Sequence, residues 1–142
     1  MDMKLSKAIC CPGFIVGFCL SLHGMDRWSA LSQIESGDND RAVGRAGEVS
    51  RYQIKPKVWQ VYAPLQADWQ KPQDSLAVVK DAMEARCRAF ERSFHRRPTD
   101  FEFYILWNAP AQIKHPTKAV TERAKRFSNL VTHEPDQSQT AN

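Results

Sequence analysis

The 142-residue chain is poor in the residues that build repetitive or disulfide-bonded proteins. It contains 6 glycines, 8 prolines and 4 cysteines, and neither sign of charge dominates, with 20 Lys and Arg against 16 Asp and Glu. The low glycine and proline content excludes collagen and low-complexity linkers. A hydrophobic fraction of 42% and a length near 140 instead fit one globular domain. The small positive charge favours anionic partners but does not choose among a cell-wall polymer, a membrane surface and nucleic acid.

The distribution of cysteine and histidine argues against a disulfide framework and against metal chemistry. Three of the four cysteines lie within the first 20 residues, and the fourth, Cys87, lies in an apolar helical stripe typical of a buried thiol. The histidines are scattered along the chain at His23, His95, His115 and His133. No glycine-rich phosphate-binding loop is present. We therefore expect no metal site and no cofactor.

The longest apolar run lies near the N-terminus and is short. Lys4 and Lys7 precede an uncharged stretch over residues 8–22, which is below the roughly 20 residues that a membrane span needs. A basic start followed by about 7–15 apolar residues is typical of a secretory signal. We expect a signal peptide over 1–21, a domain over 22–131, a disordered tail over 132–142, and export to the periplasm or the exterior. An N-terminal helix packed on the domain or kept as an anchor is the alternative.

The pattern after residue 25 predicts a mainly helical domain. Apolar spacing and capping residues indicate helices from Asp26 to about Glu35, from Pro56 to Ala63, from Asp74 or Ser75 to about Arg96, from Thr99 to before Pro110, and from Pro116 or Thr117 to Val131. Residues 41–55 contain two glycines and β-prone residues, and predict a small β-hairpin. The expected fold class is α+β, mainly α, with this hairpin beside the first helix.

Glu35 is the carboxyl group best placed for chemistry. It follows the apolar helix face of Trp28, Leu31 and Ile34, and the expected hairpin would wall it from solvent. Burial disfavours the charged form of a carboxyl group and raises its pKa. A carboxylic acid that is neutral near pH 7 can protonate a leaving oxygen, the general-acid step of glycoside cleavage. A solvated carboxylate at a helix end is the alternative interpretation.

The order of motifs around Glu35 resembles the soluble lytic transglycosylases and goose-type lysozymes of the lysozyme-like superfamily. The chain has Glu35-Ser36 at a helix end, a glycine-containing turn over 44–47, Gln-Ile-x-Pro over 53–56, and Trp-Asn-Ala over 107–109. The resemblance covers about residues 26–130 and implies a lysozyme-like helical domain with its hairpin beside the active-site helix. It also implies cleavage of the MurNAc–GlcNAc bond in peptidoglycan glycan strands.

The resemblance further implies a role for each matching side chain. Glu35 would be the catalytic acid and base. The substrate-binding residues would be Ser36, Tyr52, Gln53, Trp107 and Asn108. The two amides would hydrogen-bond the N-acetyl sugar or its peptide stem, and the two aromatic side chains would shape the groove. From the residues alone, the amides fit structural hydrogen bonds equally well, and the aromatics fit core packing.

The route that the resemblance implies uses a single acid. Glu35 protonates the glycosidic oxygen and then, as a carboxylate, deprotonates the 6-hydroxyl of the sugar, which closes a 1,6-anhydro ring. A hydrolase with two carboxyl groups needs the second one about 5–9.5 Å away. Asp38, Asp40 and Glu48 are nearest in the sequence, and the aspartates are typical of a turn that leaves a helix. A lysozyme-type hydrolase therefore stays open.

Departures from the family pattern leave a non-catalytic alternative open. Ser50 stands where many members have glycine, Trp107 replaces a tyrosine, and Pro110 replaces a glycine. These changes bear on substrate geometry more than on the fold. They would also fit a catalytically weak or inactive cell-wall-binding module.

The arginine-rich end of the long predicted helix is the strongest lead outside Glu35. Its basic residues are Arg86, Arg88, Arg92, His95, Arg96 and Arg97. Glu84 and Glu91 are interspersed among them, which is typical of a solvated helix face. We therefore expect no nucleic-acid partner. The sequence does not predict an oligomeric state.

Overall fold

The computed structural model describes residues 24–131, and within this range the fold is mainly helical, as predicted. The helices are α1 (Arg27–Ser36), α2 (Pro56–Tyr62), α3 (Pro72–Phe94), α4 (Asp100–Asn108), the short 3-10 helix η1 (Pro110–Gln112) and α5 (Lys118–Leu130). The predicted signal peptide over 1–21 and the predicted tail over 132–142 lie outside the described residues. No helix within the described range is long and apolar enough to cross a membrane.

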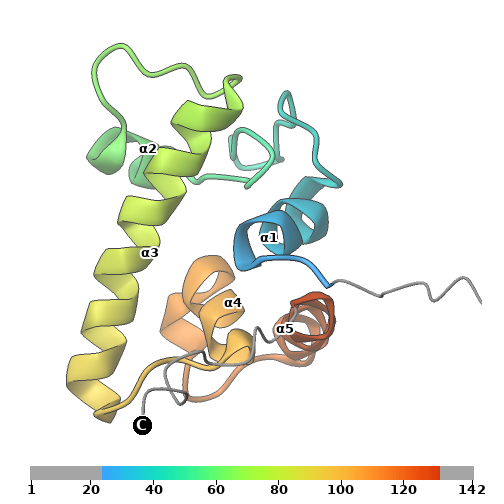
Figure 1. Ribbon diagram of the computed structural model, residues 1–142, viewed down its shortest axis with the longest axis vertical. Helices are drawn as coiled ribbons and strands as arrows, with labels where there is room; N and C mark the ends of the chain where they lie inside the picture. Colours follow the sequence, from blue (N-terminus) through green and yellow to red (C-terminus); the bar gives the residue numbers. More distant parts are fainter. Residues whose placement is uncertain (1–23, 132–142) are drawn as a thin grey trace, which may run out of the picture.

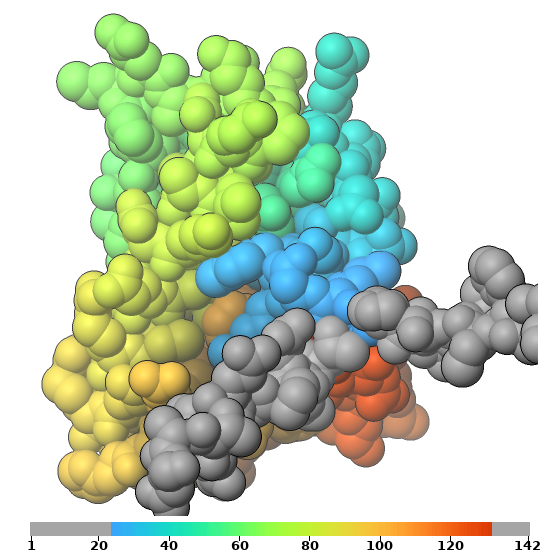
Figure 2. All heavy atoms as spheres, in the orientation of Figure 1, coloured from blue at the N-terminus to red at the C-terminus, as the bar shows by residue number. Residues whose placement is uncertain are grey.

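Helix α4 forms the centre of the packing. It contacts α3, α5 and η1, and all five residues from Phe103 to Trp107 are buried. A helix with apolar residues on every side needs neighbours all around it, which explains its central position. The long helix α3 runs along one side of the molecule and packs against α2 and α4, whereas α5 lies beyond α4 (Figure 1). On the face shown in Figure 2, α1 reaches the surface between α3 and α5.

The helix ends follow the capping residues in the sequence. The Asp26 carboxylate accepts hydrogen bonds from the backbone N–H of Trp28 at 2.8 Å and Ser29 at 3.3 Å, and Gly37 ends α1 in the left-handed conformation with φ 66°. Thr99 and Glu102 form the predicted capping box at the start of α4. These side chains satisfy backbone groups that have no partner within the helix, and they fix where the helix starts and stops.

Helix α3 begins earlier than the predicted Asp74 or Ser75. Its first residue is Pro72, whose missing N–H is not needed at the first helical position. The helix ends at Phe94, and His95 follows in the left-handed conformation with φ 55°. The amphipathic stripe was therefore identified correctly, and the polar first turn was missed because it carries no apolar residue that faces the core.

The turn segment, residues 37–55, replaces the predicted β-hairpin. Within it the structure shows only isolated antiparallel bridges, Val43 with Val49 and Val49 with Ile54. Ser50 and Gln53 have positive φ angles of 68° and 49°. Residues in the left-handed region interrupt an extended backbone, so the pairing does not grow into strands. The predicted β-hairpin is therefore not formed, although the segment does lie beside α1 as expected (Figure 1).

A backbone contact joins the two ends of the described chain. The N–H of Met25 donates a hydrogen bond to the carbonyl of Leu130 at 2.8 Å, and Met25 forms a parallel bridge with Val131. This contact holds the start of α1 beside the end of α5. The two helices also pack against each other, so both a backbone hydrogen bond and side-chain packing fix the position of α1.

Candidate active site

Glu35 lies in the last turn of α1 and is half-buried against α4. The hydroxyl group of Tyr104 donates a hydrogen bond to Glu35 Oε1 at 2.8 Å. Tyr104 is a fully buried residue of α4, so its hydroxyl has a fixed position. The contact joins α1 and α4 through two residues that are 69 positions apart in the sequence. It holds the carboxyl group in one orientation.

Burial raises the pKa of Glu35 above its usual value. Hydrogen bonds from Tyr104 and Asn108 and the positive charges of Arg123 and Lys55 act in the opposite direction and only partly offset the burial. Desolvation favours the neutral form of a carboxyl group, whereas donors and cations favour the charged form. Glu35 therefore keeps its proton to higher pH than a solvated glutamate does. It can still become a carboxylate, because the groups that stabilise the charge are already in place.

A pocket of about 300 Å³ opens beside Glu35. Its walls come from α1, the turn segment, α2, α3, α4 and α5: Glu35, Gly44, Arg45, Ala46, Glu48, Gln53, Lys55, Val58, Arg86, Trp107, Asn108 and Arg123. Four of these residues are basic and two are acidic. A pocket with this lining suits a polar ligand that carries negative charge.

Three of the five predicted substrate-binding residues line this pocket. They are Gln53, Trp107 and Asn108. Trp107 is 5% exposed, and its indole N–H donates to the carbonyl of Tyr52 at 3.1 Å, so the ring is fixed in the pocket wall. The main-chain carbonyl of Asn108 accepts from Lys55 Nζ at 3.1 Å, which ties the end of α4 to the turn segment. The structure thus brings these three residues together with Glu35.

The other two predicted residues lie elsewhere. Ser36 Oγ donates to the carbonyl of Arg51 at 2.8 Å and accepts from the N–H of Asn39 at 3.0 Å, so it ties α1 to the turn segment. The Tyr52 side chain is buried in the core and borders a different pocket. For Tyr52 the structure fits the core-packing alternative. For Ser36 it shows a link between two backbone segments and no contact with the pocket.

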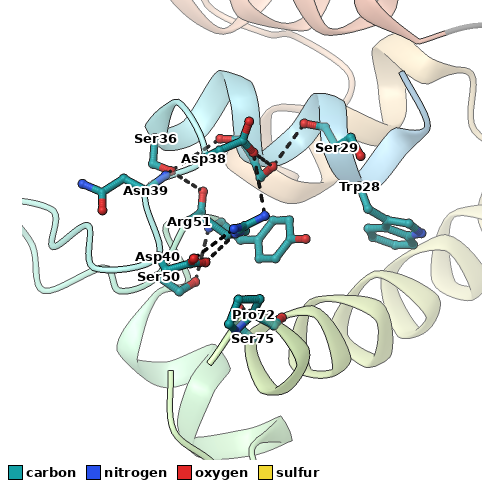
Figure 3. A network of polar contacts seen from close by, with 12 residues as sticks. Trp28, Ser29, Ser36, Asp38, Asn39, Asp40, Ser50, Arg51, Pro72 and Ser75 are labelled. Carbon is teal, nitrogen blue, oxygen red and sulfur yellow. Dashed lines mark hydrogen bonds and ion pairs between the residues drawn. The ribbon is translucent and has the colours of Figure 1, made fainter. Parts of the chain in front are cut away.

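Of the three carboxylates considered as a second acid, two are engaged by Arg51. Its guanidinium donates to Asp40 at 2.5 and 2.9 Å, and it lies 3.9 Å from Asp38, which also accepts from Ser32 Oγ (Figure 3). The hydrogen bonds from Arg51 lower the pKa of Asp40. Neither aspartate lines the pocket of Glu35. Glu48 does.

Tyr104 and Arg123 were not predicted as site residues, and Arg86 was predicted only as part of the basic helix face, not beside Glu35. Arg86 donates to the carbonyls of Leu106 at 2.8 Å and Trp107 at 2.9 Å, so it caps the end of α4. For Tyr104 a signal was available, because it stands four positions before Asn108 and lies on the same helix face. For Arg86 the arginine-rich stretch of α3 was the signal, but nothing in it indicates proximity to Glu35, and for Arg123 of α5 the linear sequence offers no signal.

Within residues 24–131 no group of His, Cys, Asp and Glu side chains is arranged to hold a metal ion. The chain matches no protein-family model, no curated protein and no solved structure.

Proposed function

We propose that this chain is a peptidoglycan lytic transglycosylase that cleaves the MurNAc–GlcNAc bond with Glu35 as its acid and base. One observation carries the proposal. The half-buried carboxyl of Glu35, whose pKa is raised by burial, borders a pocket that also presents Gln53, Trp107 and Asn108. The same four residues belong to the motifs that resemble the lysozyme-like superfamily, and we assign the fold to that superfamily as part of the proposal.

The chemistry needs one carboxyl group in two protonation states. Neutral Glu35 donates its proton to the glycosidic oxygen as the bond from that oxygen to C1 of MurNAc breaks. The resulting carboxylate is stabilised by Tyr104, Asn108 and nearby positive charge. It then accepts the proton of the 6-hydroxyl, whose oxygen bonds to C1 and closes the 1,6-anhydro ring. No water is consumed, and Glu35 ends protonated as it began.

The charge of the pocket supports a peptidoglycan strand as the partner. Arg45, Lys55, Arg86 and Arg123 line the pocket and exceed the two acidic residues there. Peptidoglycan carries carboxylates on its peptide stems, next to the sugar whose bond would be cleaved. We place the protein in the periplasm or outside the cell, where this polymer is found, on the basis of the basic and apolar N-terminal pattern.

Digestion of purified cell-wall sacculi by the full chain tests the proposal. We expect a loss of turbidity and fragments that end in 1,6-anhydro-MurNAc by mass spectrometry. Glu35→Gln removes the transferable proton and should lower the rate at least 100-fold. Glu84→Gln, on the exposed face of α3, is the matched control and should retain full activity.

Other results would identify other functions. Fragments with reducing ends alone would indicate a lysozyme-type hydrolase. Binding to sacculi without cleavage, unchanged in Glu35→Gln, would indicate a wall-binding module. Affinity for nucleic acid that falls steeply with salt and is independent of Glu35 would contradict any role in the cell wall.

A further inference from the structure

A second pocket, of about 400 Å³, shares no lining residue with the Glu35 pocket. Its walls come from the start of α1, the turn segment and α3, and they include Asp26, Trp28, Asp38, Arg51, Tyr52 and Leu76. Figure 3 shows Trp28 in the first turn of α1, and Asp38 and Arg51 beyond the end of that helix. The proposed cleavage by Glu35 makes no use of this pocket.

The hydroxyl group of Tyr52 reaches the second pocket without a hydrogen-bond partner. Tyr52 is 4% exposed, and its backbone N–H and carbonyl are bonded to Ser50 and Trp107. Its hydroxyl forms no hydrogen bond with any of residues 24–131. In that range only Ser128 Oγ is a fully buried side-chain atom left unpaired, so the Tyr52 hydroxyl has access to the pocket. A ligand can supply the partner that this buried side chain lacks.

The carboxylates of this pocket outnumber the positive charge available to it. The Arg51 guanidinium donates to Asp40 at 2.5 and 2.9 Å, so its charge is already matched by a residue that does not line the pocket. A hydrogen bond from the Ser29 hydroxyl lowers the pKa of Asp26, which therefore stays charged. Asp38 accepts from Ser32 through Oδ1, and its side chain is 46% exposed, so Oδ2 is open to a ligand. The pocket therefore attracts a cation.

The remaining lining suits an aliphatic chain attached to that cation. Trp28 and Leu76 supply apolar surface, against which methylene groups can pack. The Trp28 ring already attracts one ammonium group from outside the lining, because Lys80 Nζ lies 5.8 Å from its centroid. A metal ion fits less well, since no His, Cys, Asp and Glu side chains of residues 24–131 are grouped to hold one.

We propose that the second pocket binds an alkylammonium group, either the side chain of a lysine or a free diamine. Asp26 and Asp38 supply the negative charge, the Tyr52 hydroxyl accepts a hydrogen bond, and the methylene groups lie against Trp28 and Leu76. An ammonium group carries three donors and no acceptor, which matches this set of oxygens. Because the two pockets share no residue, this binding does not depend on glycan cleavage.

An NMR titration of the 15N-labelled full chain with N-acetyl-lysinamide tests the inference. We expect a saturable shift of the Trp28 indole N–H signal. N-acetyl-norleucinamide, which has the aliphatic chain without the ammonium group, should bind about 10-fold more weakly, because hydrogen bonds to a charged group are lost.

Two conservative variants assign the binding to the pocket. Asp38→Asn removes the charge and suits the positive φ angle of 64° at this position, and it should weaken binding about 10-fold. Tyr52→Phe removes only the hydroxyl and should weaken binding about 5-fold. Asp81→Asn, an exposed carboxylate on α3, is the matched control and should bind like the wild type.

A titration with cadaverine identifies the source of the ammonium group. Cadaverine that binds at least as tightly as N-acetyl-lysinamide would assign the pocket to a free diamine, and weaker binding would assign it to a lysine side chain. The absence of a saturable shift, equal binding of N-acetyl-norleucinamide, or an affinity unchanged in both pocket variants would overturn the inference. Ammonium binding that persists in Glu35→Gln would show that the two proposals stand or fail separately.

Discussion

Tyr104 is the residue that sets how Glu35 behaves as an acid. Its hydroxyl stabilises the charged carboxylate and so opposes the burial that raises the pKa of Glu35. Tyr104→Phe removes this donor and keeps the ring. We expect the pKa of Glu35 to rise further, because burial remains and one opposing interaction is lost. An NMR titration of 13C-labelled glutamate carboxyl groups measures the change without relying on activity.

The same substitution should move the pH profile of wall cleavage. Because the reaction needs protonated Glu35, the limb at which activity falls with rising pH should shift to higher pH, and the maximum rate should drop as the carboxyl loses its fixed orientation. The free energy of unfolding should fall by about 1 kcal/mol. Tyr62→Phe, on α2, should change neither the titration nor the profile. A pKa of Glu35 that falls in Tyr104→Phe would contradict this account of the contact.

In the turn segment, the non-glycine residue Ser50 occupies a left-handed position. Its φ angle is 68°, a conformation that costs a residue with a Cβ atom roughly 1–2 kcal/mol. Its buried hydroxyl accepts the N–H of Tyr52 at 3.2 Å, which offsets part of that cost. The glycine expected from the family pattern would fit this backbone without strain. The departure at Ser50 is therefore compatible with the same turn.

Ser50→Ala and Ser50→Gly should differ in stability. Alanine keeps the strain and leaves the N–H of Tyr52 without its partner, so we expect a loss of about 1–3 kcal/mol. Glycine loses the same hydrogen bond but relieves the strain, so its loss should be smaller by about 1 kcal/mol. Urea unfolding of the three proteins measures both. If the glycine variant were the less stable one, left-handed strain at Ser50 would be ruled out.

The start of α4 should give the fold a specific sensitivity to acid. Hydrogen bonds from Arg96, together with those from Thr99, lower the pKa of Glu102 to about 2 from its usual 4.5. A carboxyl group with a lowered pKa stabilises the fold above its unfolded pKa and loses this effect as pH falls. Glu102 should thus contribute fully above about pH 4.5 and progressively less down to pH 2.

Glu102→Gln tests this window. At pH 7 we expect the variant to be less stable than the wild type by about 1 kcal/mol, a typical value for a helix cap. The difference should shrink as urea unfolding is repeated toward pH 2.5. Glu122→Gln, whose partner Lys118 is exposed on α5, should differ little from the wild type at any pH. A gap between Glu102→Gln and wild type that is constant with pH would refute the assignment.

The sequence predicts an element well where a few neighbouring residues determine it. Asp26, Thr99 and Pro56 act within one helical turn, so the sequence predicts the helix starts that they form. The turn segment depends instead on left-handed residues such as Ser50. The hydrogen bond from the N–H of Tyr52 to the Ser50 hydroxyl offsets part of the cost of this backbone conformation. A serine in the sequence does not indicate a positive φ angle. The β-prone residues around Ser50 therefore predicted a regular hairpin.

At the scale of the whole molecule, the pocket is assembled from segments that no local pattern connects. The motif order predicted Glu35, Gln53 and Asn108, and the structure places all three in one pocket. Arg123 joins them only because α5 packs against α4, and Tyr104 reaches Glu35 only because α1 lies beside α4 in the fold. The Tyr52 ring is buried in the core, a position that the sequence alone could not distinguish from the wall of a groove. The composition of the pocket therefore follows from tertiary packing, which sequence periodicity does not predict.

The core behind the pocket should control its chemistry. Phe127 is fully buried, and its ring centroid lies 5.6 Å from that of Tyr104, which holds Glu35. Phe127→Leu leaves space beside Tyr104, so wall cleavage should fall several-fold at a temperature where the variant remains folded. Val79→Ala, also fully buried but on α3, provides a control for lost stability alone and should cleave at the wild-type rate. Equal loss of activity in both variants would mean that general destabilisation, and no coupling through Tyr104, accounts for the effect.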